Sequence, residues 1–153
     1  MLARLRTVAD EGTSAGRIER TRSTPRWPSH HPPFSAVQAT WNILERSAQL
    51  SLQAAADHGW TVIVKEAMAN GRLAPGETLN VDRLAIAAGT TSDALAIGAA
   101  LAQDWAHIIL SGAVTTAQLE SNTRARPLNI GAAELYPLAI PSERYWAERA
   151  ERK

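Results

Sequence analysis

The chain has 153 residues, of which 16 are basic and 15 acidic, giving a formal net charge of +1, and it contains no cysteine. This near balance of charge gives no reason to expect a nucleic acid or a membrane surface as a partner. The absence of cysteine excludes disulfides and thiolate chemistry and fits the reducing environment of the cytoplasm. The most apolar stretch, residues 94–114, is interrupted by Gln103, Asp104 and His107, which excludes a membrane span.

The composition of the chain changes near residue 33. Residues 1–33 carry six arginines against three acidic residues and close on four prolines, without a sustained apolar period. Such a composition cannot bury enough apolar surface to offset the entropy lost on ordering. We therefore predict a disordered N-terminal segment over residues 1–33 and a folded domain over residues 34–153.

Three short apolar segments of the folded part predict strands. They are SAVQAT (35–40), TVIVKEA (61–67) and HIILS (107–111). The second is rich in β-branched residues and almost wholly apolar up to Lys65. Continuous apolar strands of this kind belong to parallel sheets that are buried on both faces.

Helix-forming segments alternate with these strands. They cover residues 47–58, 82–88 and 92–103, a stretch from about 115, and a final helix from about 142. Gly59 stands in the usual stop position after the first of them, and Ser92 and Asp93 lie near the N-cap of the third. Residues 127–141 contain three prolines and predict irregular structure. The alternation predicts an α/β fold with a parallel sheet.

The helix start that follows the third strand has the chemistry of an anion site. Gly112 and Ala113 leave the backbone uncrowded, and Thr115 to Gln118 fits the capping-box pattern T-x-x-Q. A capped helix start exposes N–H groups at the positive end of the helix dipole, which suits a phosphate. Any α/β protein also needs caps and small turns, so spacing alone leaves both interpretations open.

Two further motifs fail on their chemistry. GRLAPGET (71–78) nearly matches the P-loop, but Glu77 takes the lysine position and would repel phosphate, while Pro75 removes an N–H donor. Residues 81–103 have the layout of a helix-turn-helix, but their would-be recognition helix, 92–103, has no Lys or Arg. The four histidines lack the spacing of metal ligands, so no metal site is predicted.

Five blocks of the folded part resemble, in order and spacing, the C-terminal half of aldo/keto reductases. They are PFSAVQATWNILE (33–45), GWTVIVKEAMANGRL (59–73), the helices of 84–103, IILSGAVTTAQLESN (108–122) and ERYWAERA (143–150). The resemblance implies a partial TIM (β/α)₈ barrel with about three strand-helix units. It also implies a family that binds NADP(H) at the carboxyl ends of its strands and interconverts carbonyls and alcohols.

The resemblance assigns roles to single positions as well. The positions that match the family's cofactor cradle are Gln38, Lys65, Glu66, Met68, Gly71, Gly112, Ala113, Thr115, Gln118, Ser121 and Asn122. Gln38 matches the glutamine that hydrogen-bonds the nicotinamide carboxamide. The residues between 65 and 71 match the loop that runs along the nicotinamide face and past the pyrophosphate. The residues between 112 and 118 match the site of the adenosine 2′-phosphate. Ser121 and Asn122 match the pair that hydrogen-bonds the edge of the adenine.

The sequence departs from the family pattern in residue types and in length. The family usually has an aromatic residue where Lys65 stands and a base near Gln118, which leaves NAD(H) open as the cofactor. A complete barrel takes ~250 residues, about twice the length of the matching region. The family's catalytic Asp, Tyr, Lys and His precede that region, and residues 1–33 contain no Tyr or Lys.

These departures predict a truncated oxidoreductase that keeps the cofactor cradle and has no catalytic residue of its own. It would act on a small carbonyl substrate only if the missing half were supplied. The alternative is a non-enzymatic half-barrel that associates with itself or with a complementary half, because a three-strand sheet has two open edges.

Overall fold

The structure, a computed structural model, describes residues 16–17, 34–128, 130 and 132–152. The predicted disorder of residues 1–33 falls outside these residues, apart from Gly16 and Arg17. Those two residues form the short strand β1, which the sequence does not predict.

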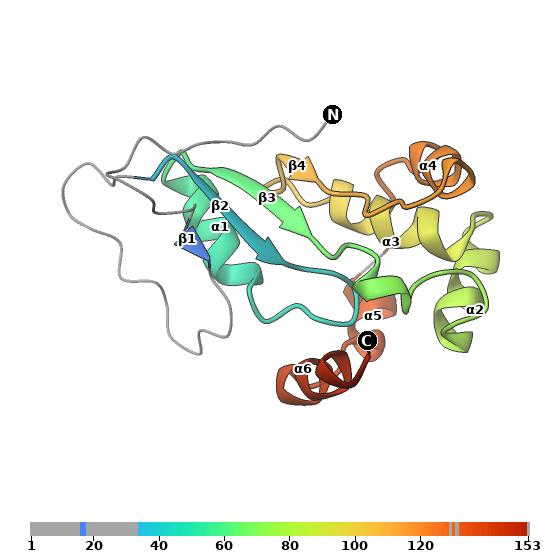
Figure 1. Ribbon diagram of the computed structural model, residues 1–153. Coiled ribbons are helices and arrows are strands. Elements are labelled where there is room, and N and C mark those ends of the chain that lie inside the picture. Colours follow the sequence, from blue (N-terminus) through green and yellow to red (C-terminus); the bar gives the residue numbers. More distant parts are fainter. Residues whose placement is uncertain (1–15, 18–33, 129, 131, 153) are drawn as a thin grey trace.

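The sheet has four parallel strands in the order β1, β2, β3 and β4 (Figure 1). They span Gly16–Arg17, Ala36–Thr40, Thr61–Lys65 and Ile108–Ile109. β4 is shorter than the predicted 107–111. The His107 N–H nevertheless bonds the Val62 carbonyl (3.1 Å), and the Leu110 N–H bonds the Val64 carbonyl (2.9 Å), so backbone pairing extends beyond both ends of β4. The predicted parallel arrangement is confirmed.

Helices occupy the segments between and after the strands. In chain order they are α1 (Gln49–Asp57), η1 (Ala69–Gly71), α2 (Leu79–Ala87), α3 (Ser92–Leu101), α4 (Thr116–Thr123), α5 (Ala132–Leu135), η2 (Tyr136–Leu138) and α6 (Ser142–Glu151). The predicted stop at Gly59 is confirmed, and this glycine has a φ of 80°. The irregular structure predicted over 127–141 is wrong for α5 and η2. Pro137 lies in the first turn of η2, where its missing N–H is not needed.

Two apolar clusters hold the elements together. The first joins the sheet to α1 and α3 and takes alternate strand residues, since successive side chains of a strand point to opposite faces. Its members include Val37, Ala39, Val62, Val64, Leu52, Ala55, Trp41, Trp60 and Trp105. The second joins the segment after β2 to α2, α3, α5 and α6, with Ile43, Leu44, Leu73, Val81, Leu95, Leu135 and Tyr145 among its members.

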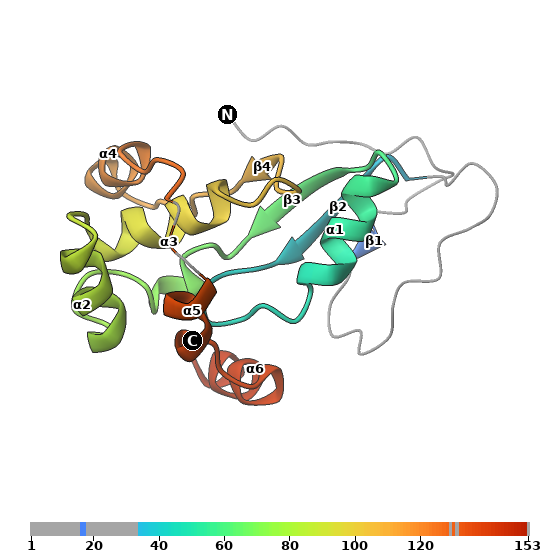
Figure 2. The same ribbon diagram turned by 180° about the vertical axis from the view of Figure 1, so that it is seen from behind.

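The strands point toward the helices that carry the second cluster. Figures 1 and 2 show α1 alongside β2 and β3, whereas α2, α3 and α4 gather beyond the arrowheads of β2 and β3. The two views place α6 below the strand-end loops and α4 above them. Among the described residues no single helix is long and apolar enough to cross a membrane. α2 and α3 reach that length and hydropathy only together, and they are bent by 76°.

Candidate functional site

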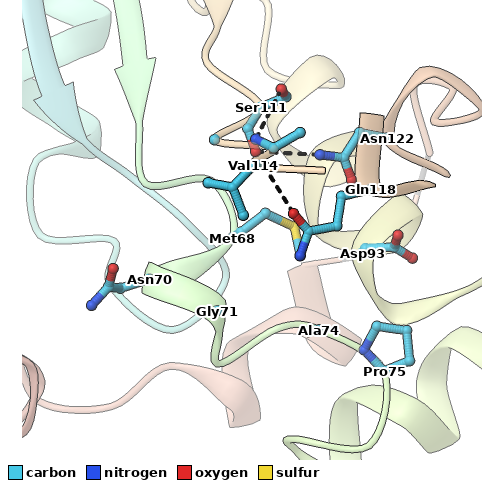
Figure 3. A pocket seen from close by; sticks show the side chains of 12 residues that line it. Met68, Asn70, Gly71, Ala74, Pro75, Asp93, Ser111, Val114, Gln118 and Asn122 are labelled. Carbon is cyan, nitrogen blue, oxygen red and sulfur yellow. Dashed lines mark hydrogen bonds between the residues drawn. The ribbon is translucent and has the colours of Figure 1, made fainter. Parts of the chain in front are cut away.

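A cavity of about 370 Å³ lies where the loops after β3 and β4 meet α3 and α4 (Figure 3). The two loops contribute mostly small and apolar groups together with the Asn70 amide, and the helices α3 and α4 contribute an acid and two amides. The lining residues are Met68, Asn70, Gly71, Ala74, Pro75, Asp93, Ser111, Gly112, Ala113, Val114, Gln118 and Asn122. The cavity therefore opens at the carboxyl ends of parallel strands, where ligands of such folds bind.

The start of α4 is fixed by a reciprocal pair of hydrogen bonds. The Gln118 N–H donates to Thr115 Oγ1 (3.2 Å), and the Val114 N–H donates to Gln118 Oε1 (2.9 Å; Figure 3). The predicted capping box therefore forms, although its return bond lands one residue before the N-cap, Thr115. Because Val114 and Gln118 both line the cavity, the positive end of the helix dipole lies at the cavity wall.

The loop after β3 has an unusual backbone. Glu66, Ala69 and Asn70 have positive φ angles of 56°, 48° and 55°, a region that residues other than glycine seldom adopt. Each such residue costs roughly 1–3 kcal/mol and persists only where its surroundings hold it. The Asn42 side chain (3.0 Å) and the Ala69 N–H (2.8 Å) both donate to the Glu66 carbonyl. These bonds hold the 68–75 wall of the cavity in one conformation.

Asp93, in the first turn of α3, is the one acid among the described residues of the cavity wall. Its Oδ2 accepts a hydrogen bond from the Ser121 hydroxyl of α4, whereas its Oδ1 is buried without a partner. Burial raises the pKa of this carboxyl, but the Ser121 and Thr91 hydroxyls and the Ala94 N–H together hold the pKa below its usual value. Neither Thr91 nor Ala94 reaches hydrogen-bonding geometry with Oδ1.

The structure brings six of the eleven predicted cofactor residues to the cavity wall. They are Met68, Gly71, Gly112, Ala113, Gln118 and Asn122. Asn122 is nearly buried, and its amide donates to the Ser111 carbonyl (3.3 Å), which fastens α4 to the loop after β4. Segments far apart in the sequence thus form one wall.

The other five predicted residues do not line the cavity. They are Gln38, Lys65, Glu66, Thr115 and Ser121. Thr115 and Ser121 contact lining residues through their hydroxyls. Thr115 accepts a hydrogen bond from the Gln118 N–H, and Ser121 donates one to Asp93. Gln38 lies in the middle of β2, and Lys65 is the last residue of β3.

The side chain of Glu66 is directed to α6 instead of the cavity. The Arg149 Nε donates to both of its carboxylate oxygens (3.0 Å each), and the Tyr145 hydroxyl donates to one of them (3.4 Å). The Asn42 amide donates to the Tyr145 hydroxyl (3.1 Å). Burial raises the pKa of Tyr145 to about 12, with a further increase from the Glu66 charge, so this phenol stays neutral. Glu66 therefore fastens α6 to the end of β3.

Six lining residues were missed by the sequence prediction. They are Asn70, Ala74, Pro75, Asp93, Ser111 and Val114. Ala74 and Pro75 belong to the loop that fails as a P-loop, and Ser111 and Val114 flank the predicted small residues. No Lys or Arg is among the described lining residues, and the described chain has no group of three His, Cys, Asp or Glu that could hold a metal ion.

The chain forms a parallel α/β domain with a cavity at the strand ends, and solved structures show which fold it belongs to. No protein-family model and no curated protein matches the chain. A thermostable aldo-keto reductase, Tm1743, solved in complex with the inhibitor epalrestat, matches 67% of the chain at 19% identity and a TM-score of 0.55. Aldo-keto reductase AKR11C1 from Bacillus halodurans matches 69% of it in both forms, at 20% identity (holo) and 21% (apo) and a TM-score of 0.53.

The chain spans about two fifths of the length of these enzymes, covering 38%, 42% and 44% of them respectively. The predicted partial (β/α)₈ barrel and the resemblance to aldo-keto reductases are confirmed at the level of the fold. This likeness does not by itself assign a cofactor or a substrate to the chain.

Proposed function

We propose that the cavity binds a nicotinamide dinucleotide and that the chain is the cofactor-binding part of an aldo-keto reductase-like oxidoreductase. The observation that carries the proposal is the gathering of six predicted cofactor residues around one strand-end cavity. Its volume of about 370 Å³ lies within the range of small-molecule sites, ~300–1,000 Å³. The resemblance favours NADP(H), with NAD(H) as the alternative.

The residues of the wall fit parts of such a ligand. The backbone of Gly112 and Ala113 and the start of α4 offer N–H groups without crowding, which suits a phosphate group of the cofactor. Met68 gives an apolar surface, and Gln118 and Asn122 present amides to the polar edge of a base or sugar. A bound nicotinamide would supply the hydride of a carbonyl–alcohol interconversion.

We propose that the cavity itself supplies no proton donor for that reaction. No tyrosine or histidine is among the described lining residues of the cavity. Tyr145 is fully buried and bonds Asn42 and Glu66, so its hydroxyl serves the fold. We therefore propose that a small carbonyl substrate is turned over only when the remaining strands of a barrel are supplied.

Isothermal titration calorimetry with NADH and NADPH tests the proposed binding. We expect saturable binding of at least one of them, and its loss in an Ala113→Trp variant, because the half-buried Ala113 lines the cavity and an indole would fill it. Ala88→Trp is the matched control, since Ala88 is exposed at the end of α2 and does not line the cavity. Binding that survives Ala113→Trp unchanged, or no binding at all, would reject the proposal.

A second candidate function is association through the sheet edge. β4 pairs only with β3 in the described sheet, and Ile108 on this strand is 37% exposed. An open edge with an exposed apolar side chain invites pairing with another chain. Light scattering over a range of concentrations would show a dimer that Ile108→Lys dissociates. A monomer at every concentration would exclude this role without affecting the cofactor proposal.

A further inference from the structure

Two aspartates lie in the first turns of neighbouring helices but differ in how fully they are bonded. Asp82 in the first turn of α2 accepts from the Ser92 hydroxyl, and the Gly76 N–H lies 3.2 Å from each of its oxygens. Asp93 in the first turn of α3 accepts a hydrogen bond from the Ser121 hydroxyl. Both aspartates tie one helix to the next, but Asp93 alone keeps a buried oxygen without a donor.

The charge of Asp93 is not neutralised by a cation. Asp93 is only 7% exposed, and it takes part in none of the ion pairs among the described residues. The described lining of the cavity contains no Lys or Arg. A hydroxyl donor, the role Ser121 takes, stabilises a carboxylate without cancelling its negative charge. The described cavity wall therefore has a negative charge with no cationic side chain beside it.

Asp93, on α3, lies next to the part of the wall that α4 forms. Figure 3 shows Asp93 on the same side of the cavity as Asn122 and across from Asn70. Its bond to Ser121 places the carboxylate beside the two α4 residues that match the adenosine end of a dinucleotide. A phosphate carries close to two negative charges at neutral pH, whereas a ribose diol is neutral and donates hydrogen bonds.

We propose that Asp93 makes this a site for NAD(H) rather than NADP(H), because its carboxylate, which has no cation beside it, repels a 2′-phosphate more strongly than the neutral hydroxyls of an unphosphorylated ribose. The inference rests on the proposed dinucleotide binding and adds the choice between the two cofactors. Carboxylates select the unphosphorylated ribose in other dinucleotide-binding folds by the same physics. The repulsion acts through a partly desolvated wall, where a charge is screened less than in water.

Dissociation constants for NADH and NADPH, measured by calorimetry, test the inference. We expect the unmodified chain to bind NADH at least about tenfold more tightly. Asp93→Asn keeps an oxygen for Ser121 but removes the charge, so NADPH binding should tighten by roughly the same factor while NADH changes much less. Asp82→Asn removes the same charge outside the cavity and should leave the ratio unchanged.

A second variant keeps the test decisive if Asp93→Asn does not fold. Val114 lines the cavity and is 86% exposed, so Val114→Arg adds a positive charge without removing a buried contact. It should tighten NADPH binding selectively, and the neutral Val114→Gln should not. A preference of the unmodified chain for NADPH, or a ratio that neither Asp93→Asn nor Val114→Arg moves, would overturn the inference and leave dinucleotide binding intact. If neither NADH nor NADPH binds, both the proposed function and this inference are rejected.

Discussion

Glu66 and Asp93 both lie near the strand-end loops, and the polar groups around them differ in one respect. Around Glu66 each charge has a counter-charge: Glu66 pairs with Arg149, and Glu148 pairs with Arg72 at 2.8 Å. Around Asp93 the carboxylate has hydroxyl and N–H groups beside it but no cation among the described residues. A buried charge with a full set of partners contributes to the fold, whereas one without them can act on a ligand.

The group around Glu66, which we call the α6 network, comprises Asn42, Glu66, Arg72, Tyr145, Glu148 and Arg149. The guanidinium of Arg72 also lies 5.4 Å from the centre of the Tyr145 ring, a cation–π distance. The comparison predicts that changes to Tyr145 and Arg149, the α6 side chains bonded to Asn42 and Glu66, alter stability and leave cofactor binding unaffected. Asp93→Asn, which keeps an oxygen for Ser121, should alter cofactor binding more than stability.

The largest effect is expected from Tyr145→Ala. Tyr145 is fully buried in the second apolar cluster, so its loss leaves a cavity and removes the bond to Asn42. The free energy of unfolding should fall by about 3–5 kcal/mol in urea titrations. Tyr136→Ala is the matched control, because Tyr136 is 75% exposed, and should change it by less than about 0.5 kcal/mol. Equal losses for the two variants would contradict the role given to the network.

A second effect should appear at high pH. The folded pKa of Tyr145, about 12, lies above the ordinary value of 10.0, so the stability from the neutral phenol is complete below pH 10 and is lost as the pH rises toward 12. The difference in unfolding free energy between the unmodified chain and Tyr145→Phe should fall by roughly 2–3 kcal/mol over this interval. A difference that stays constant from pH 9 to 12 would show that the phenol titrates normally.

Arg149→Met should have a smaller effect on stability. It leaves the Glu66 carboxylate, whose side chain is 15% exposed, without its cation, while the 38% exposure of Arg149 weakens the pair. We expect a loss of about 1–2 kcal/mol in unfolding free energy and no change in the dissociation constant of NADH. Arg144→Met removes an arginine that is 69% exposed and should cost less than about 0.5 kcal/mol. A marked loss of NADH binding in Arg149→Met would contradict the prediction that the α6 network affects stability without affecting cofactor binding.

The smallest effect on stability is expected at the start of α4, which both caps the helix and lines the cavity. Thr115→Ala removes the N-cap of α4 and should lower the unfolding free energy by about 1 kcal/mol. It should also weaken NADH binding, since the freed start of α4 lines the cavity. Thr123→Ala, at the other end of the helix, removes only a bond to the Glu120 carbonyl and serves as the control. Unaltered NADH binding in Thr115→Ala would show that the helix start is not part of the site.

Local features of this chain were predictable from its sequence. The β-branched run up to Lys65 predicts a parallel strand, Gly59 predicts the end of α1, and Thr115 with Gln118 predicts the start of α4. In each case the determining contacts lie within a few residues, so the pattern and the structure depend on the same short stretch. The small residues after β4 were assigned to the cavity for the same reason.

Features that depend on distant contacts were not predictable. The bond between Asp93 and Ser121 joins residues 28 apart, and the pair of Glu66 and Arg149 joins residues 83 apart. No spacing rule links such positions, so Asp93 was identified only as a residue near a helix cap and Glu66 was assigned to the cofactor. α5 and η2 formed despite three prolines because Leu135 packs in the second apolar cluster, a tertiary contact that outweighs local propensity.

The most direct test of dinucleotide binding is to follow the glycine amides by nuclear magnetic resonance while NADH is added. Gly71 and Gly112 line the cavity, whereas Gly59 and Gly89 lie at helix ends that do not line it. Binding in the cavity predicts that the Gly71 and Gly112 signals shift together and saturate, while those of Gly59 and Gly89 stay in place. Signals of Gly71 and Gly112 that do not move at millimolar NADH would contradict it.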